Sequence, residues 1–415
     1  MAPMSIEKSD AGRGSPPREP GGFERVEEAL SRSGPGGALE ALAEVLEREK
    51  KYPQLFEALL MRSRAALGLP LIPLGPATEL PEEILKPHEE AIAAACRKVG
   101  GHYLAEGDIV AAWPYFRALG ETAPVAEAIR RIEPGSKRKD LEELIDIALH
   151  QGVEPRRGLE MLLANSGICS SITAMERSLP ASREAQEDCV RVLVRALYDE
   201  MVTSVRADLA RRGVPPEGRA PQGDGGPAGG GARLGDLIAG KPWLFADGGY
   251  HADPSHLWSV MRLSAALEAG PELDQALELA DYGSRLASLY HYKSDPPFED
   301  FYRDHTIYLA GRRSRGPENE RAAAHFRDKV RAARARGDDR YPLGAVLEIL
   351  TRLGRAREAV DLSLEMSGSP LETGTPSLGE LCQRAGEFTR LAEVSRARGD
   401  LLGFAAGLVQ SKRRP

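Results

Sequence analysis

The sequence has few cysteines, and none is placed to form a local metal or redox site. The 415 residues include four cysteines and no CxxC motif, which excludes a zinc ribbon or a thioredoxin-like pair. The four are scattered along the chain, at Cys96, Cys169, Cys189 and Cys382. Isolated thiols of this kind are typical of small buried hydrophobic residues in a reducing compartment.

Long apolar runs and an excess of basic residues are also missing. No stretch approaches the roughly 18 to 20 apolar residues of a membrane span, and the N-terminus lacks the apolar core of a secretory signal. We therefore expect no membrane segment and a cytoplasmic location. The chain carries 55 Lys and Arg against 62 Asp and Glu, a net charge of −7. Nucleic acid is not expected as a partner, because a general nucleic-acid binder needs a basic face.

Aromatic residues are scarce at 6%, and no segment alternates apolar and polar residues as a strand would. Ala, Leu, Glu and Arg dominate the patterned segments, and these are strong helix formers. Hydrophobic residues make up 42% of the chain, which is enough for a folded interior. The length exceeds one ordinary core. The sequence therefore predicts an all-α fold, built as two compact units or one elongated array.

The distribution of glycine and proline divides the chain into four segments. Residues 1–22 are rich in Gly, Pro, Ser and charge, which predicts a disordered N-terminal tail. Residues 23–212 and 234–411 carry helical periodicity and form the predicted N-terminal and C-terminal helical arrays. Between them, more than half of residues 213–233 are Gly or Pro, as in a flexible linker. A surface insertion within one continuous array is the alternative.

Within the arrays the predicted helices come in pairs. Three pairs follow the Gly/Pro-rich segment: Pro254–Ala269 with Glu272–Leu289, Phe298–Leu309 with Pro317–Ala335, and Leu343–Leu353 with Arg355–Met366. Leu378–Gly379 and the turn at Gly386 indicate another, and Gly386 lies 32 residues after the turn at Gly354. That distance is close to the period of a two-helix repeat. Residues 182–212 predict one long helix with a kink near residues 201–204.

One stretch, residues 93–126, fits a helix-pair repeat of about 34 residues best. Small residues fall where two antiparallel helices would approach closely, and aromatic residues where neighbouring pairs would meet. A Gly-Asp pair occupies the turn, and a proline starts the next helix, where its missing N–H is tolerated. The matching residues are Gly100, Tyr103, Gly107, Ala112, Phe116 and Pro124. Pro114 departs from the pattern, so we expect the second helix to begin near Ala111 or Ala112.

Residues 93–126 resemble a tetratricopeptide repeat, and residues 23–411 resemble an array of such repeats more loosely. The resemblance implies an α-solenoid, a right-handed superhelix of antiparallel helix pairs with a concave groove. It implies no catalytic activity and no cofactor. We therefore expect a non-catalytic scaffold that binds a peptide or another protein in its groove. An oligomerising structural protein is an alternative function.

A histidine-rich region is the strongest candidate for chemistry. His251, Asp253 and His256 have the residue types that bind zinc or iron. Asp304 and His305 lie about one repeat later, so neighbouring helices could bring them to the same point. A metal-dependent or other enzyme site around these residues is therefore a further alternative function. The spacing matches no metalloenzyme motif, and whether a metal binds stays open.

The same region has a structural interpretation. Asp253 followed by Pro254 is a good N-cap with proline at the first helical position. Tyr250 and Trp258 could anchor a peptide at the mouth of a groove, or they could pack between repeats. Farther upstream, Cys169 lies among small hydroxyl residues without a histidine close by except His150. A nucleophilic cysteine needs an activating base, so we expect a buried cysteine in a tight helix–helix turn.

Overall fold

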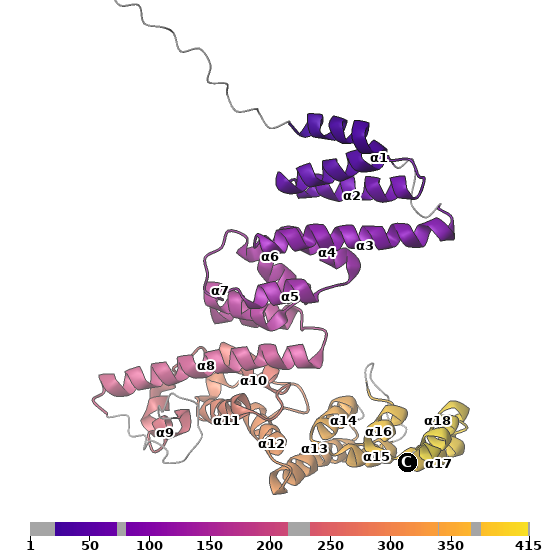
Figure 1. The fold of residues 1–415 in the computed structure, drawn as a ribbon. Helices are drawn as coiled ribbons and strands as arrows, with labels where there is room; N and C mark the ends of the chain where they lie inside the picture. The colour runs from indigo at the N-terminus through magenta and orange to yellow at the C-terminus, as the bar shows by residue number, and fades with distance from the viewer. Residues whose placement is uncertain (1–20, 73–79, 215–232, 339, 367–374, 414–415) are drawn as a thin grey trace, which may run out of the picture. The chain divides into compact units, whose positions relative to one another are not determined.

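A computed structural model describes residues 21–72, 80–214, 233–338, 340–366 and 375–413. Of these residues 75% are helical and none lies in a strand, so the prediction of an all-α protein is confirmed. Figure 1 shows the helices in chain order. No helix in this part of the chain has an apolar stretch long enough to cross a lipid bilayer.

The chain divides into two compact units, residues 1–158 and 159–415. Residues 1–20 of the predicted tail lie outside the described residues, and the first helix begins at Gly22. The predicted linker, residues 213–233, falls within the second unit, and its residues 215–232 also lie outside the described part. The helices on either side of it, α8 (Arg183–Arg211) and α9 (Leu234–Ile238), pack against each other.

The first unit is a succession of helices, in which α1 to α5 each pack against the next and α6 packs against α4. Its helices are α1 (Gly22–Arg48), α2 (Tyr52–Ala66), α3 (Glu82–Ala105), α4 (Ile109–Leu119), α5 (Ala123–Arg130) and α6 (Leu141–Ile145), which continues as the π-helical turn Asp146–His150. Contacts join α1 to α2, α2 to α3, α3 to α4, and α4 to both α5 and α6. Gly34 interrupts α1 with a left-handed φ of 69°, a conformation that glycine adopts without strain.

The helix pair predicted from residues 93–126 is formed by α3 and α4. Gly107, with φ of 79°, makes the turn, and Asp108 caps α4 by accepting a hydrogen bond from the Ala111 N–H at 3.0 Å. The two helices touch at Gly100, where an added Cβ would lie 2.7 Å from a ring carbon of Phe116. Ala112 is fully buried nearby along α4. The predicted pair and its turn are thus confirmed.

Two details of this pair differ from expectation. The Phe116 ring fills the space within the pair, over Gly100, and it is Tyr103 that reaches the preceding helix, with its ring 4.9 Å from that of Tyr52. The prediction that α4 starts near Ala111 is wrong, because it starts at Ile109 and Pro114 lies inside it. The strong Asp108 cap fixes the first turn ahead of the proline. Pro124 lies in the first turn of α5, as predicted.

The second unit contains most of the helices of the described chain. They are α7 (Pro155–Arg177, starting in the first unit), α8, α9, α10 (Pro254–Ser264), α11 (Pro271–Ser284), α12 (Phe301–Arg313), α13 (Pro317–Ala335), α14 (Leu343–Arg352), α15 (Ala356–Glu365), α16 (Leu378–Ala385), α17 (Phe388–Arg398) and α18 (Leu401–Lys412). Short 3-10 segments lie at Pro242–Gly248 and Ser288–Tyr290. The three predicted helix pairs correspond to α10 with α11, α12 with α13, and α14 with α15, and are confirmed.

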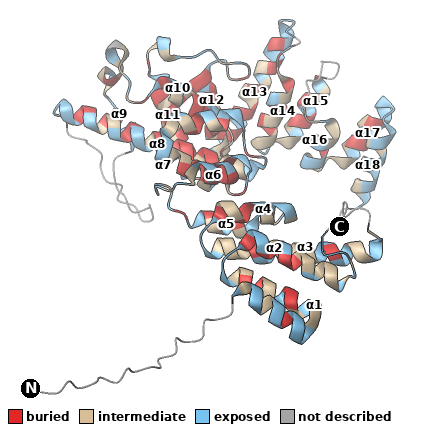
Figure 2. Ribbon diagram, turned by 90° about the horizontal axis from the view of Figure 1, so that it is seen from above, coloured by how far each residue is buried: buried red, intermediate tan, exposed pale blue. Residues whose placement is uncertain are grey.

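From α10 to α18 each helix packs against its successor in the chain. The long helix α8 adds a brace, since it packs against α9, α10 and α11. Buried residues lie where the helices face one another, and exposed residues lie on the opposite faces (Figure 2). The predicted kink near residues 201–204 is absent, because α8 is helical without interruption from Arg183 to Arg211.

Close approaches at small residues join the successive helices of the second unit. A Cβ added at Gly283 of α11 would lie 2.2 Å from the ring of Tyr302 on α12. A Cβ at Gly311 of α12 would lie 2.5 Å from the Cβ of Ala322 on α13. Neither position has room for a side chain, so each glycine sets the distance between two helices.

Buried polar side chains tie the same helices together at their ends. Arg312, whose side chain is only 5% exposed, donates hydrogen bonds to the backbone carbonyls of Leu267, after α10, and Arg352, at the end of α14. Asn319 of α13 donates to the carbonyls of Gly311 and Leu353, at 2.9 and 2.8 Å. These bonds satisfy carbonyls that the helix ends leave without intrahelical partners.

One cysteine differs from the prediction. Gly167 breaks α7 with φ of 79°, which gives the tight turn expected there. However, Cys169 is exposed, whereas Cys96, Cys189 and Cys382 are buried, and none of the four forms a disulfide. The expectation of a buried cysteine at this turn is therefore wrong: the residue follows the break on a side of the helix that faces solvent.

Candidate functional site

The first candidate residue, His251, lies just before α10 and is held by two buried groups. Its backbone N–H donates to the Tyr282 hydroxyl at 2.9 Å, and its Nδ1 lies 2.8 Å from the same oxygen. The Tyr282 hydroxyl therefore donates its proton to Nδ1, and the ring proton of His251 is on Nε2. This Nε2 lies 3.5 Å from a carboxylate oxygen of Asp208 on α8. Burial lowers the pKa of His251, although Asp208 opposes the shift. These bonds occupy both ring nitrogens.

Asp253 is the N-cap of α10. Its Oδ1 accepts hydrogen bonds from the Ser255 backbone N–H and hydroxyl, at 2.8 and 2.6 Å, and Pro254 occupies the first turn. The bonds from Ser255 hold the pKa of Asp253 below its ordinary value. The carboxylate therefore acts as the N-cap predicted from the Asp-Pro sequence. His256 lies in the first turn of α10 and is half-buried.

Asp304 is a buried carboxylate at the start of α12. Its side chain accepts a hydrogen bond from Lys329 Nζ at 2.6 Å and lies 2.7 Å from Nε2 of His325, both on α13. It also accepts from the Asp300 backbone N–H at 3.0 Å. A buried charge needs this degree of compensation. The cluster fastens α12 to α13.

His305 is enclosed by aromatic rings. Its Nδ1 lies 2.8 Å from the carbonyl oxygen of Phe301 and donates to it, and ring centroids of Phe298 and Phe301 lie 4.3 Å from its own. Burial lowers its pKa to about 4, so the ring is neutral at pH 7. It occupies a core position.

These residues do not form one site. The polar partners of His251 lie on α8 and α11, whereas those of Asp304 lie on α13 and His305 bonds within its own helix. Among the residues that the structure describes, no three His, Cys, Asp or Glu side chains are placed to hold a metal ion. The candidate residues thus do not converge on one point.

The two aromatic candidates have different environments. Tyr250 is 52% exposed and packs edge-on against Tyr290, with the ring centroids 5.3 Å apart. Trp258 stacks on Phe301 at 5.7 Å, and the guanidinium of Arg262 lies 4.8 Å from its ring centre. Trp258 therefore packs between helices and positions an arginine at the surface of α10.

That arginine borders an apolar groove of about 320 Å³ in the second unit. The lining residues come from α8, α10, α12, α14 and their adjoining loops: Leu179, Gln186, Val190, Arg262, Leu263, Ala265, Ala266, Phe298, Tyr308, Ala345, Glu348, Ile349 and Arg352. None comes from α9, α11, α13 or α15. The groove is thus lined by the first helices of three successive pairs, together with α8.

Arginines outnumber glutamates at the rim of the groove. Arg262 pairs with Glu176 at 2.6 Å. Burial opposes ionisation of Glu348, but its ion pairs, with Arg183 at 2.8 Å, Arg352 at 3.2 Å and Arg384 at 3.3 Å, outweigh this and lower its pKa. Two arginines, Arg262 and Arg352, and one glutamate, Glu348, thus line the groove, and their ion-pair partners are Arg183, Arg384 and Glu176.

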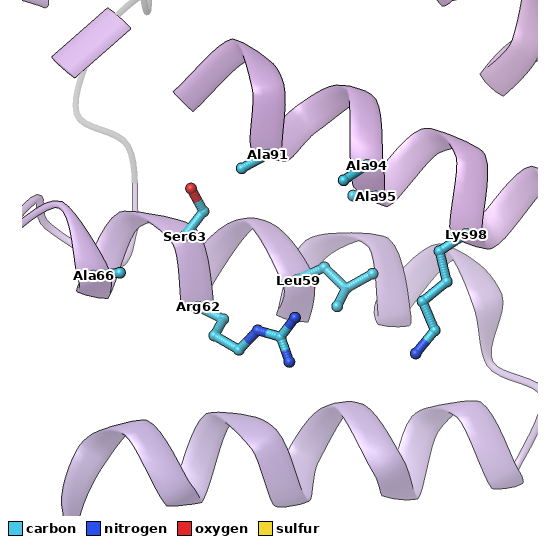
Figure 3. Close-up of a pocket in the computed structure, with 8 residues that line it drawn as sticks. All are labelled: Leu59, Arg62, Ser63, Ala66, Ala91, Ala94, Ala95 and Lys98. Carbon is cyan, nitrogen blue, oxygen red and sulfur yellow. The ribbon is translucent and has the colours of Figure 1, made fainter. Parts of the chain in front are cut away.

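A smaller hollow of about 300 Å³ lies in the first unit, between α2 and α3. Figure 3 shows its lining: Leu59, Arg62, Ser63 and Ala66 from α2, and Ala91, Ala94, Ala95 and Lys98 from α3. Lys98 is engaged by Glu47 at 2.5 Å. The hollow has alanine walls and lacks an acid–base pair within its lining.

Comparison with known proteins does not assign the chain to a family: no family model matches it, and neither curated proteins nor solved structures gave a significant match. The groove residues were not predicted as a site. The sequence indicates only that helices come in pairs, so that the first helices of successive pairs could lie on one face. It does not reveal which face carries a groove.

Proposed function

We propose that the chain is a non-catalytic α-solenoid of tetratricopeptide-like helix pairs that binds an extended segment of another protein. The observation that carries this proposal is the groove lined by α8, α10, α12 and α14. In a stack of helix pairs, the first helices of successive pairs share one face, and a ligand laid along that face contacts several repeats. The packing of each helix against its successor supports the same architecture.

The chemistry of the groove favours a ligand with a large apolar side chain beside an acidic residue. Leu179, Leu263, Phe298 and Ile349 offer apolar surface, and Leu179 is 50% exposed. The surplus arginines of the rim would attract a carboxylate. A buried apolar anchor with a charged flank is a common arrangement in peptide recognition.

Selection of peptides from a random displayed library against the full-length protein tests the proposal. Enriched peptides should share a large apolar residue within two positions of Asp or Glu. Ala345→Trp, at an exposed position of the groove, should fill it and weaken binding at least tenfold. Ala332→Trp, at an exposed position of α13 outside the groove, is the matched control.

Two outcomes would contradict the proposal. One is the absence of any enriched motif. The other is an enriched motif whose binding is equally insensitive to Ala345→Trp and Ala332→Trp. Binding of an acidic flank should also weaken several-fold between about 50 and 300 mM salt, because surface ion pairs are screened. The predicted cytoplasmic location accords with four cysteines that form no disulfide.

A further inference from the structure

The last helix, α18, has an unusual distribution of charge. Residues 401–411 contain no charged residue, and charges occur only at the two ends: Asp400 at the N-cap, and Lys412 and Arg413 at the C-terminal end. The preceding helix, α17, carries Arg390, Glu393, Arg396 and Arg398, as expected of a solvated helix. The composition of α18 is that of a helix with a covered face.

The exposed side of α18 is apolar. Leu401 and Leu402 are 76% and 85% exposed, Leu408 and Val409 are 45% and 50% exposed, and Gly407 alone in this helix is buried. Gly407 lies against α17, where an added Cβ would come within 2.6 Å of the backbone. The outer residues recur at spacings of three and four, the pattern of a helix that packs on another helix.

Clustered exposed apolar side chains of this kind mark interaction surfaces. Small apolar positions flank the leucines, since Ala405 and Ala406 are also exposed. We infer that α18 pairs with α18 of a second copy of this chain, antiparallel about a twofold axis.

The residue pattern is self-complementary in that arrangement. With the axis at Ala405, Leu401 faces Val409 of the second copy and Leu402 faces Leu408 of the second copy, while the two Ala405 methyl groups meet at the closest approach. The two helix dipoles are also antiparallel, so their ends attract.

Other occupants fit the observations less well. An anionic lipid surface favours a helix with a row of cations along its polar face, but α18 has cations only at one end and an aspartate at the other. The exposed Phe23 and Leu30 of α1 could receive α18 of another copy. That contact is heterologous and would grow beyond two copies, whereas the twofold pair closes.

Sedimentation equilibrium of the full-length protein tests the inference. The mass should rise from 44.9 kDa to twice that value between about 1 and 100 µM, the range expected for a small interface. The double variant Leu402→Glu and Leu408→Glu should weaken dimerisation at least 100-fold with an unchanged helical spectrum. Leu289→Glu, at a leucine 69% exposed elsewhere, should dimerise normally.

A crosslinking experiment tests the register. In a Cys169→Ser background, Ala405→Cys should form a disulfide-linked dimer under mild oxidation, because the axis brings the two thiols together. Ala332→Cys, on exposed α13, should not. A monomer at every concentration, a mass that keeps growing beyond the dimer, or a dimer unaffected by the α18 variants would each overturn the inference. So would α18-dependent sedimentation with phosphatidylserine vesicles by a protein that stays monomeric without them.

Discussion

Adjacent glycines in α3 offer a matched test of how closely α3 and α4 are packed. Gly100 faces Phe116, whose ring is 4% exposed and cannot swing into solvent. Gly101, one residue later, has nothing within 4 Å of an added Cβ. Both residues lie inside the helix, so replacement by alanine gives the same gain in helix propensity at each, about 0.5 to 1 kcal/mol.

The two substitutions should therefore act in opposite directions. Overpacking against Phe116 costs about 1 to 3 kcal/mol, so Gly100→Ala should lower the stability of the α3–α4 pair by a net value of roughly 0.5 to 2 kcal/mol. Gly101→Ala should raise it by about 0.5 to 1 kcal/mol. Phe116→Leu, combined with Gly100→Ala, should recover part of the loss, because the smaller side chain vacates the contact.

Hydrogen exchange measured by mass spectrometry on the full-length protein reports this pair locally. Amides of α3 and α4 should exchange roughly twofold to thirtyfold faster in Gly100→Ala, since 1.4 kcal/mol is a factor of ten. They should exchange more slowly in Gly101→Ala. If both variants slow exchange equally, the contact between Gly100 and Phe116 does not limit the approach of the helices, and the argument fails.

Three other predictions concern the second unit. Arg312→Met should lower the free energy of unfolding by about 3 kcal/mol, because it leaves buried carbonyl groups without hydrogen-bond donors. Urea denaturation measures this loss, and Arg312→Lys should retain part of the stability. Asp304→Asn should lower the free energy of unfolding by about 2 kcal/mol, because it removes the buried one of the two carboxylates that pair with Lys329, the other being Glu299. A loss below about 1 kcal/mol would show that the cluster is dispensable. His305 has a folded pKa of about 4 against 6.5 for the unfolded chain, so the unfolded state binds the extra proton and stability falls as pH drops from about 6.5 to about 4, by up to about 3 kcal/mol. In a plot of melting temperature against pH, His305→Gln should reduce the slope over this pH range. An unchanged slope would contradict the lowered pKa of His305.

The helix pairs were predictable because their turns carry a local signal. Gly354 and Gly386 adopt left-handed φ values of 76° and 70°, which glycine accepts readily. Amphipathic segments on either side complete the pattern. The bounds predicted for α13, Pro317–Ala335, agree with the structure to the residue, whereas the predicted helix Glu272–Leu289 extends five residues beyond the end of α11. The arrangement of the pairs in space was not predictable in the same way, since it depends on contacts between distant residues.

The repeat pattern was less informative about which glycine matters. Gly379 matches the expected Leu-Gly position, but an added Cβ there would meet only the Ser377 hydroxyl at 3.8 Å. Gly311 was not singled out, although it sets the distance between α12 and α13. A glycine in the right position of a pattern is thus necessary only where the opposing helix presents a side chain.

Residue type alone was a poor guide to the site. His251, Asp253 and His305 were candidates because their side chains can bind metals, but each is engaged by a capping, hydroxyl or carbonyl partner. The groove consists of leucine, alanine, arginine and similar residues that are common throughout the chain. Only their convergence from four helices distinguishes them, and periodicity within one helix does not encode it.

The brace formed by α8 has a consequence for how this polypeptide could be divided. Because α8 packs against α9, α10 and α11, the polypeptide segments before and after residues 213–233 contribute to one hydrophobic core. Two separately expressed pieces, ending at Val214 and beginning at Arg233, would each expose the surface that the other normally covers. Such fragments should find one another and reassemble, which makes this position suited to a split reporter whose signal requires both halves.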